Sequence, residues 1–440
     1  MRLVDAFRDA LASLELEPGP ALVAVSGGRD SVVLLDLLMA TRGSHGLDLT
    51  VAHVDHGINP DSSSVANGVE RLAGGYGVPF ARARLTLGQS ATETLARTRR
   101  YQWFEQLGMA LGADIVFLAH HADDQAETVL MRALCGSGPA GLAAMTLRQG
   151  PFVRPLLGFD GEELERYAVD RGLSWWNDPA NGDTRHLRSW VRASLMPVLR
   201  ARMPDIDSRL LELGAQAAAD RAAWDSLLDA LPELDIRTEP DGCSVAAPIL
   251  ARYDKGLALT LLQAAARRVG CVLGRTRAAR VLELVRRGTS GKMIELGGTW
   301  RAELAFDRLR VVAVSRVPGP RAVLPLPRQG DLRWGDWTLR CRPDTAPVEQ
   351  RRAARSAWFR PAELMVGPAR PGERVRPLGG VGRRQVVRCF QEACVPRSRR
   401  VDWPVVSAAG EVVWIPEVCR SGALMPAAGT EAVRVDADHD

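Results

Sequence analysis

The stretch VAVSGGRDSVVLLD, residues 23–36, joins an apolar run to a segment with helical periodicity. The run over 21–25 predicts a short buried strand and residues 31–40 predict a helix, so residues 26–31 lie where a strand meets a helix N-terminus. In a doubly wound sheet, ligands bind at such a junction. The two glycines permit a tight turn, and the free amides at the helix start favour an anion. The stretch therefore predicts an α/β domain with a phosphate-binding turn.

Asp30 indicates which kind of phosphate ligand the turn accepts. A carboxylate inside an anion-binding turn repels phosphate unless a divalent cation lies between them, so Asp30 predicts Mg²⁺ bridging to a polyphosphate. The turn contains neither G-x-x-x-x-G-K-[ST] nor G-x-G-x-x-G, which excludes the two commonest nucleotide-binding loops. The alternative interpretation is a tight structural turn in which Asp30 only caps the helix.

The rest of the chain predicts further domains. Up to about residue 200, the apolar runs ALVAV, LTVAHVD, VPFARARL and DIVFLAH alternate with helix-like segments, which is typical of a Rossmann-like doubly wound parallel sheet. Asp160 and Glu163 predict a capping box at one helix start. Segments rich in Ala and Leu over 205–287 predict a mostly helical middle region, followed by strands at KMIELGG and DRLRVVAV. The β-like runs WTLRCR and EVVWIPEV follow a Pro-rich connection.

We predict four parts along the chain from these patterns. They are an α/β domain over residues 1–204, a mostly helical middle domain over 205–316, a Pro-rich linker over 317–331 and a small α+β C-terminal domain over 332–440. A chain of 440 residues is long enough for two or three domains, each of which buries a core of its own.

The composition is that of a globular protein with a mildly basic charge. Hydrophobic residues make up 46% and charged residues 25%, which excludes disordered and fibrous proteins. The net charge of +5 allows a polyanionic partner. Seven cysteines without a C-x-x-C pair predict reduced thiols in a cytoplasmic protein. The chain has neither the pattern of a signal peptide nor an apolar run of the roughly 18 residues that a membrane span needs.

Several stretches resemble those of one enzyme family. SGGRDS is similar to the SGG-x-D-S loop of the N-type ATP pyrophosphatase, or PP-loop, superfamily. Within that superfamily, the tRNA(Ile)-lysidine synthase family has stretches that resemble AHVDHGINPDS, ETLARTRRYQWF and LAHHADDQAETVLMRALCGSGPAGLAAM. The resemblance covers most of residues 20–200. It resumes in the last domain at RPGERVRPLGGVGRRQVVRCFQEACVPRSRRVDWPVV and EVVWIPEV.

The resemblance implies a specific ligation. ATP adenylates the C2 oxygen of the wobble cytidine in the CAU anticodon of tRNA(Ile), and free L-lysine then displaces AMP to give lysidine. Decoding switches from AUG to AUA. ATP and Mg²⁺ are the implied cofactors, the first domain is the implied catalytic domain, and the middle and last domains are the implied tRNA-binding domains. The oligomeric state stays open, with a homodimer as one option.

Candidate nucleotide and metal ligands follow from the turn and the resemblance. Asp124, in the DD pair after DIVFLAH, is predicted to lie near metal or substrate, so Asp30 and Asp124 are the candidate Mg²⁺ ligands. The alternative for Asp123 and Asp124 is ordinary negative charge at a helix start. The predicted nucleotide-binding residues are Ser26, Gly27, Gly28, Arg29, Asp30, Ser31 and His53.

Candidate catalytic residues serve the two chemical steps. Arg97 and Arg100 lie three apart on a predicted helix and match phosphate oxygens, although an exposed salt-bridge face is the alternative. Glu127 is the candidate to hold the lysine ammonium and to help it lose a proton, and His120 or His121 is the alternative proton acceptor or phosphate contact. The predicted catalytic set is Asp30, Arg97, His120, Asp124 and Glu127.

The candidate tRNA contacts are mostly arginines of the last domain. Residues 370–400 are rich in arginine and contain only two glutamates, which predicts a surface for phosphate groups, with a solvated basic face as the alternative. Ser189 replaces the Asn of the family pattern R-N-x-x-R, and arginines replace lysines common at 383 and 384, so contact geometry there differs. The predicted tRNA-binding residues are Arg188, Arg192, Arg374, Arg376, Arg383, Arg384 and Arg388.

Three other functions compete with this interpretation. A tRNA thiolase with the same loop is the first, and the absence of C-x-x-C counts against it. An amidotransferase-like synthetase would need a glutaminase domain, which the sequence does not indicate. A non-catalytic tRNA-binding protein would have no need of the intact SGGRDS turn, and ATP turnover distinguishes it from an enzyme.

Overall fold

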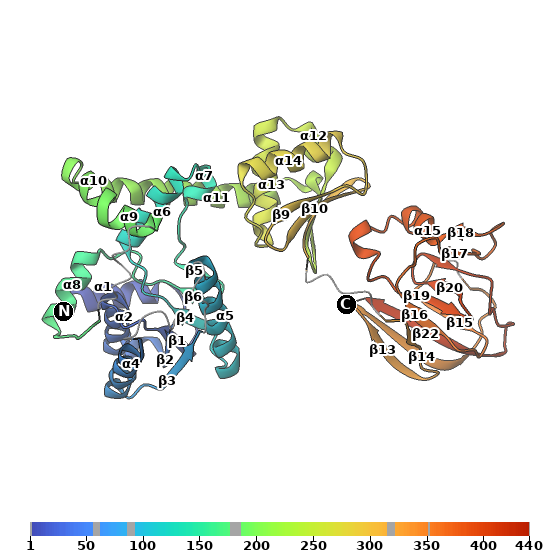
Figure 1. The fold of residues 1–440 in the computed structure, drawn as a ribbon, viewed down its shortest axis with the longest axis horizontal. Coiled ribbons are helices and arrows are strands. Elements are labelled where there is room, and N and C mark those ends of the chain that lie inside the picture. The colour runs from blue at the N-terminus through green and yellow to red at the C-terminus, as the bar shows by residue number, and fades with distance from the viewer. Residues whose placement is uncertain are drawn as a thin grey trace. The chain divides into compact units, whose positions relative to one another are not determined.

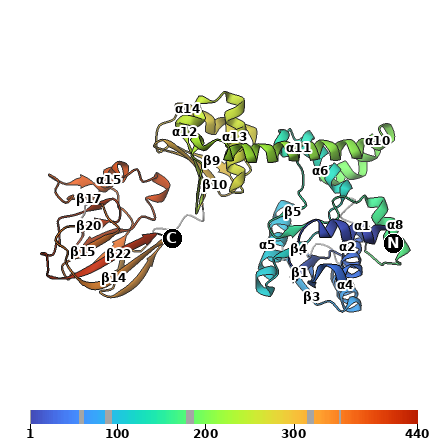
Figure 2. The same cartoon turned by 180° about the vertical axis from the view of Figure 1, so that it is seen from behind.

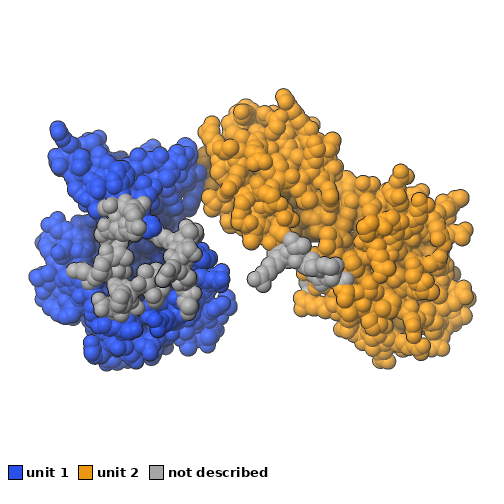
Figure 3. All heavy atoms as spheres, in the orientation of Figure 1, with its two compact units in different colours: residues 1–223 blue, residues 224–440 orange. Residues whose placement is uncertain are grey.

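The chain forms two compact units in a computed structural model that describes residues 2–55, 62–85, 93–176, 186–314, 322–350 and 353–439. Unit 1 is Met1–Ala223 and unit 2 is Trp224–Asp440 (Figure 3). The boundaries of the four predicted parts remain a prediction, and residues 317–321 of the predicted linker lie outside the described residues. No helix among the described residues is both long and apolar enough to cross a bilayer.

A six-stranded sheet forms the centre of unit 1 (Figure 1). Its strand order is β3-β2-β1-β4-β6-β5, in which the first five are parallel and β5 runs antiparallel to β6. The predicted Rossmann-like doubly wound sheet is therefore confirmed. The strands are β1 (Gly19–Ala24), β2 (Leu47–Asp55), β3 (Phe80–Arg84), β4 (Ile115–Phe117), β5 (Arg148–Gln149) and β6 (Phe152–Val153).

Helices cover both faces of this sheet, and Figures 1 and 2 show α5 on the face opposite α1, α2 and α4. Helix α2 buries every side chain from Ser31 to Leu38 because it packs between the sheet and other helices. The helices up to residue 229, not all of which pack on this sheet, are α1 (Arg2–Ala12), α2 (Arg29–Ala40), α3 (Arg42–His45), α4 (Ser62–Tyr76), α5 (Glu93–Leu111), α6 (Ala122–Leu134), α7 (Pro139–Leu142), α8 (Gly161–Asp170), α9 (Leu187–Trp190), α10 (Met196–Arg202) and α11 (Ile206–Asp229), and α11 continues past Ala223 into unit 2.

The strand order puts a topological switch point between β1 and β4. The chain leaves β1 toward β2 on one side, and β4 lies on the other side of β1, so the connections diverge above the carboxyl ends of these two strands. In open α/β sheets, ligands bind in the crevice at this point. The segment 25–28 leaves β1 there and the segment 118–121 leaves β4 there, which brings the glycine turn and the His-His-Ala-Asp-Asp segment to one edge of the sheet.

A buried carboxylate ties three helices of unit 1 together. Asp36 of α2 is 1% exposed and accepts hydrogen bonds of 2.5 Å from the hydroxyls of both Tyr76 and Tyr167. Arg171 donates to the two carboxylate oxygens at 3.1 and 3.2 Å. Burial raises the pKa of Asp36, but the hydrogen bonds from Arg171 and the tyrosines outweigh burial, so its pKa lies below the ordinary value.

We expect Asp36→Asn to lower the free energy of unfolding by about 2–3 kcal/mol at pH 7, because the substitution leaves buried donors without a charged acceptor. A carboxylate with a lowered folded-state pKa stabilises above its unfolded pKa, and that stabilisation is lost as pH falls through the folded pKa. The difference from the unsubstituted protein should therefore shrink below about pH 4. Urea unfolding at pH 7 and pH 3.5 measures it, with exposed Asp9→Asn as the control. A difference independent of pH would contradict the assignment.

Unit 2 begins with a five-stranded antiparallel sheet covered by helices. The region 205–287, predicted to be mostly helical, also contains the strands β7 and β8, which form a hairpin too short for its alternation to stand out among Ala-rich segments. The strands predicted at KMIELGG and DRLRVVAV are confirmed as β9 and β11. The elements are β7 (Arg237–Glu239), β8 (Gly242–Ala246), α12 (Ala247–Arg252), α13 (Lys255–Arg268), α14 (Arg275–Arg287), β9 (Met293–Gly297), β10 (Trp300–Ala305) and β11 (Arg308–Ala313).

The rest of unit 2 is β-rich, with two sheets packed around one core. The core contains the fully buried side chains of Phe359, Phe390 and Trp414. The strands are β12 (Leu324–Pro325), β13 (Gly330–Trp334), β14 (Trp337–Thr345), β15 (Ser356–Phe359), β16 (Met365–Gly367), β17 (Arg374–Val375), β18 (Arg384–Gln385), β19 (Val405–Ala408), β20 (Glu411–Ile415), β21 (Cys419–Arg420) and β22 (Glu431–His439), and α15 is Val386–Glu392. The predicted α+β domain therefore contains a single α-helix among its described residues.

Candidate functional site

The glycine turn gathers hydrogen-bonding groups at the start of α2. The Ser26 hydroxyl accepts from the Gly28 amide at 3.2 Å and lies 3.2 Å from the Ser31 hydroxyl, which itself donates to the Gly28 carbonyl at 2.7 Å. Gly28 is the N-cap of α2 and provides no side chain to cap the first turn. The first amides of a helix have no intrahelical acceptor, so they are available to an anion, and the helix dipole favours negative charge there.

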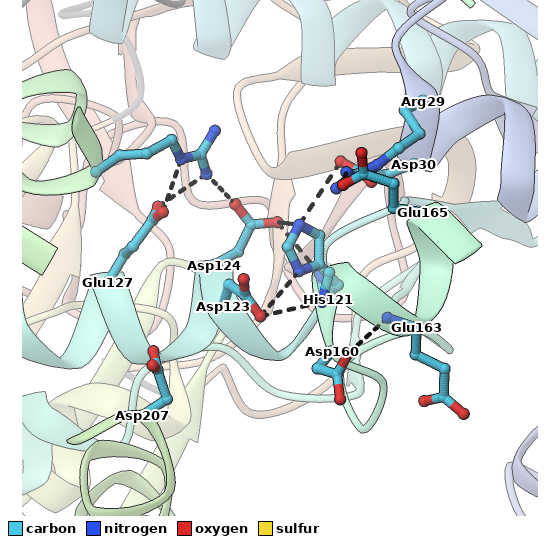
Figure 4. A network of polar contacts seen from close by, with 12 residues as sticks. Arg29, Asp30, His121, Asp123, Asp124, Glu127, Asp160, Glu163, Glu165 and Asp207 are labelled. Atoms are coloured by element: carbon cyan, nitrogen blue, oxygen red, sulfur yellow. Dashed lines mark hydrogen bonds and ion pairs between the residues drawn. The ribbon is translucent and has the colours of Figure 1, made fainter. Parts of the chain in front are cut away.

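His121 lies between three carboxylates at the crevice (Figure 4). Its Nε2 is 3.6 Å from both Asp30 Oδ2 and Asp124 Oδ2, and its Nδ1 is 3.7 Å from Asp123 Oδ1. Asp30 follows β1, whereas the other three residues follow β4, so the switch point brings them together. The sequence interpretation weighed His120 and His121 equally and chose His120, but the structure puts His121 at the centre of this cluster.

The cluster is charged at neutral pH. Burial lowers the pKa of His121, but the nearby carboxylates of Asp123, Asp30 and Asp124 outweigh burial and raise the pKa to about 10. Burial alone would raise the pKa of Asp30. The contacts with His121 and Arg29 outweigh burial, so the pKa of Asp30 lies below its ordinary value. The nearby His121 imidazolium lowers the pKa of Asp123 to about 2. The crevice therefore contains an imidazolium surrounded by carboxylates.

Two arginines contact the carboxylates predicted to be catalytic. Arg192 donates to both oxygens of Glu127, at 2.6 and 2.8 Å, and to Asp124 at 2.6 Å. Arg188 donates to Asp124 at 3.0 Å and lies 3.6 Å from Glu127. Asp124 and Glu127 are 8% and 3% exposed, so these contacts neutralise buried charge. Both arginines were predicted to bind tRNA, and that role stays a prediction beside the contacts seen here.

Helix α6 presents these carboxylates, whereas Arg188 lies in α9 and Arg192 in the turn that follows it. Asp124 and Glu127 lie three apart on α6, so they share one face. A π-helical turn, Val191–Leu195, follows α9 and contains Arg192, and Val191 packs into a small core beside α6. Single π-turns are rare in proteins as a whole, and many of those that occur lie at functional sites.

The remaining predicted residues lie near the strand ends. Burial lowers the pKa of His120 to about 3, so its imidazole is neutral. His53, at the end of β2, is 3% exposed, has its Nδ1 2.8 Å from the Val25 carbonyl, and has a pKa that burial lowers. Arg97 of α5 donates to the Tyr101 hydroxyl at 2.9 Å and stacks over that ring. Their roles remain predictions.

Long-range contacts add residues that the sequence interpretation missed. Arg29 donates to its neighbour Asp30 and to Glu165 of α8, both at 2.8 Å. The Gly161 amide donates to Asp123 at 3.1 Å, and the Asp160 cap next to it accepts from the Glu163 amide at 2.6 Å. The Asp160 half of the predicted capping box is therefore confirmed. No local pattern connects α8 with the glycine turn, because their contact depends on the packing of α8 against α2.

The residues fit the Mg²⁺ that the turn predicts. Asp30 and Asp124 offer carboxylate oxygens, the ligands that Mg²⁺ prefers, on either side of His121 Nε2. Over the described ranges, no group of three or more His, Cys, Asp or Glu side chains is arranged to hold a metal. Two carboxylates suit a cation whose remaining ligands are phosphate oxygens and water, as is common for Mg²⁺ in nucleotide sites.

The predicted tRNA-binding arginines of the last domain are exposed, and they differ in their contacts. Arg383 pairs with Glu411 at 2.6 Å, and Arg384 pairs with Glu392 at 2.8 Å. The other three have no side-chain partner among the residues that the structure describes. They are Arg374, Arg376 and Arg388. All five belong to unit 2, whereas the crevice belongs to unit 1.

Comparison with known proteins gives matches in both units. The PP-loop domain family matches residues 5–199, and the TilS substrate C-terminal domain family matches residues 364–437. A tRNA(Ile)-lysidine synthase of Alkalilimnicola ehrlichii is 33% identical over 90% of this chain and 90% of its own length. The synthase of that name from Geobacter sulfurreducens is 31% identical over 94% and 92% of the two chains. That from an Azoarcus species is 32% identical over 98% and 95%.

Proposed function

This chain belongs to the tRNA(Ile)-lysidine synthase family, and we propose that its lysidine chemistry takes place in the crevice between the carboxyl ends of β1 and β4. The enzyme is an ATP-using ligase that modifies tRNA(Ile) with lysidine. The observation that carries the assignment is the convergence of the SGGRDS turn and the buried acidic residues of α6 at this crevice. One group can bind the phosphates there, and the other can bind an amine.

The turn binds the β- and γ-phosphates of ATP. The amides at the start of α2 and the hydroxyls of Ser26 and Ser31 donate hydrogen bonds to phosphate oxygens. Asp30 and Asp124 would hold Mg²⁺, which when bound neutralises phosphate charge. The imidazolium of His121 and the guanidinium of Arg97 contribute further positive charge. These groups make pyrophosphate a better leaving group when the wobble C2 oxygen attacks the α-phosphorus.

Glu127 binds the amine in the second step. The ε-ammonium of free L-lysine has a reference pKa of about 10.4, so it must lose a proton before its nitrogen attacks C2. A buried carboxylate such as Glu127 can hold the ammonium and accept that proton. The new C–N bond forms as the C2–O bond breaks, and AMP leaves with the oxygen. His120, with its low pKa, is a weak base and serves as a neutral hydrogen-bonding group.

Both carboxylate oxygens of Glu127 accept hydrogen bonds from Arg192 in the structure, so the amine must share this carboxylate with Arg192. We assign Arg188 and Arg192 to the charge balance of the two acidic side chains, in addition to the tRNA contact predicted for them. The CAU anticodon, free L-lysine and a cytoplasmic location complete the proposal. A homodimer remains a prediction.

The test is incubation of the purified protein with ATP, Mg²⁺, radiolabelled lysine and unmodified CAU-containing tRNA(Ile), followed by nucleoside analysis. We expect labelled lysidine with AMP and pyrophosphate as co-products. AMP release without incorporation of lysine would contradict the proposed nucleophile. Incorporation of sulfur from a sulfide donor in the same assay would indicate the thiolase alternative instead.

The exposed arginines of the last domain should contribute to tRNA affinity. We expect the double substitution Arg374→Ala with Arg376→Ala to weaken tRNA binding and to reduce the salt slope by about one per arginine, because each removes a phosphate contact. Arg383→Ala with Arg384→Ala should have a smaller effect, since each arginine is already paired with a glutamate. ATP affinity should not change in either variant.

Filter binding over a series of salt concentrations measures both quantities, and Arg8→Ala on α1 is the control. Unchanged affinity and slope for both double variants would remove this face from tRNA recognition.

A further inference from the structure

A tryptophan far along the chain packs beneath the glycine turn. The backbone amide of Trp176, which follows α8, donates to the Gly27 carbonyl at 2.9 Å. Its indole ring lies against Gly68 of α4 and against Gly27 itself. The contacts therefore join three segments of unit 1 that have no proximity in the sequence.

The indole lies in close contact with both glycines. A Cβ atom added at Gly68 would lie 2.1 Å from Cζ2 and 2.6 Å from Cη2 of Trp176. A Cβ atom added at Gly27 would lie 2.7 Å from Val65 Cγ1 and 3.3 Å from Trp176 Cε3. Gly27 also has a φ of +93°, which side chains rarely adopt. Both positions thus require glycine while Trp176 is in place.

The hydrogen bond from Trp176 orients a peptide group of the turn. In a trans peptide, the carbonyl and the amide of the next residue point in opposite directions. Holding the Gly27 carbonyl therefore also holds the Gly28 amide, which points toward the Ser26 hydroxyl at 3.2 Å. A peptide between two glycines has few steric barriers to rotation. Without the contact from Trp176, only the 3.2 Å hydrogen bond to the Ser26 hydroxyl would restrain this amide.

We propose that Trp176 is a positioning residue for phosphate binding, which pre-orients the Gly27–Gly28 peptide and packs the turn against α4. The inference rests on the proposed function, because it takes residues 26–31 as the pyrophosphate-binding turn. Trp176 is not a catalytic residue, since it acts through the turn. Pre-organised donors bind an anion more tightly because they lose less conformational freedom on binding.

Gly68→Ala tests the proposal without substituting Trp176 or any residue of the turn. Its new methyl group would displace the indole, whereas Gly75→Ala on the same helix, which meets no atom within 4 Å, is the matched control. Calorimetric titration with inorganic pyrophosphate and with ATP measures binding. We expect Gly68→Ala to weaken both by about tenfold or more and Gly75→Ala to leave both unchanged.

A second series changes the ring itself. We expect Trp176→Ala to raise the KM for ATP with little change in the KM for lysine, and Trp176→Phe to restore much of the loss, because both keep the backbone amide but only Phe keeps a ring. Pyrophosphate and ATP affinities equal to those of the unsubstituted protein in Gly68→Ala and Trp176→Ala would overturn the proposal. Equal losses for ATP and lysine would also overturn it, since they indicate a general loss of structure.

These outcomes are separable from those that test the proposed function. Titration with pyrophosphate needs neither tRNA nor lysine, so it reports on the turn even if the unsubstituted protein forms no lysidine. Conversely, lysidine formation by the unsubstituted protein together with unchanged pyrophosphate affinity in the variants would refute only the role of Trp176. If Gly68→Ala lowers the melting temperature strongly, the Trp176 series decides the question.

Discussion

Asp30→Asn is expected to lower the rate of lysidine formation by about 10²- to 10³-fold without unfolding the protein, a loss comparable to removal of one electrostatic group from a transition state. The carboxylate lies at the start of α2, inside the turn, where negative charge is useful only if a cation accompanies the phosphates. Asn has nearly the same shape but removes the charge. It also removes one of the carboxylates that raise the pKa of His121.

Two readouts separate these effects. The isotope exchange between ATP and pyrophosphate in the presence of tRNA reports on adenylation, and circular dichroism reports on folding. Asp30→Glu, which keeps the charge but moves it, should lose less activity than Asp30→Asn. Asp48→Asn, an exposed carboxylate on β2, is the matched control and should behave like the unsubstituted protein. Exchange by Asp30→Asn within tenfold of normal would remove Asp30 from the mechanism.

Glu127→Gln is expected to raise the KM for lysine by about 10²-fold while adenylation continues, because loss of one member of a buried charge pair costs 2–5 kcal/mol. The side chain is 3% exposed and accepts two hydrogen bonds from Arg192. Gln keeps the shape but can neither neutralise an ammonium nor accept its proton. Adenylated tRNA should therefore accumulate, and it should react slowly when lysine is added in excess.

Quenched-flow assays with labelled ATP measure the adenylated tRNA, and labelled lysine measures the second step. Glu162→Gln, an exposed residue of α8, is the control for loss of a carboxylate elsewhere in the domain. Normal affinity for lysine and normal turnover in Glu127→Gln would show that another group receives the amine. An equal loss in both steps would contradict the assignment of Glu127 to the second step alone.

Local patterns predicted the parts of the fold that depend on neighbouring residues. The alternation of apolar runs and helical segments predicted β1 to β4 because each buried strand between helices has its own short apolar run. The hairpin of β7 and β8 escaped prediction because strands of three and five residues provide too few alternations. The pairing of β7 with β8 and of β8 with β11 provides the stabilisation that local propensity does not.

The sequence by itself determined the doubly wound class of unit 1, the glycine turn between its first strand and helix, and the candidate carboxylates Asp30, Asp124 and Glu127, because strand–turn–helix junctions and motif spacings are local properties. Only the tertiary structure decided that His121 lies between two of these carboxylates and that Arg192 pairs with Glu127. It also decided that Trp176 packs under the turn. The physical reason is that these contacts join residues that lie far apart in the sequence, as Glu127 and Arg192 do with a separation of 65 positions. They form only because of which strands become neighbours in the sheet.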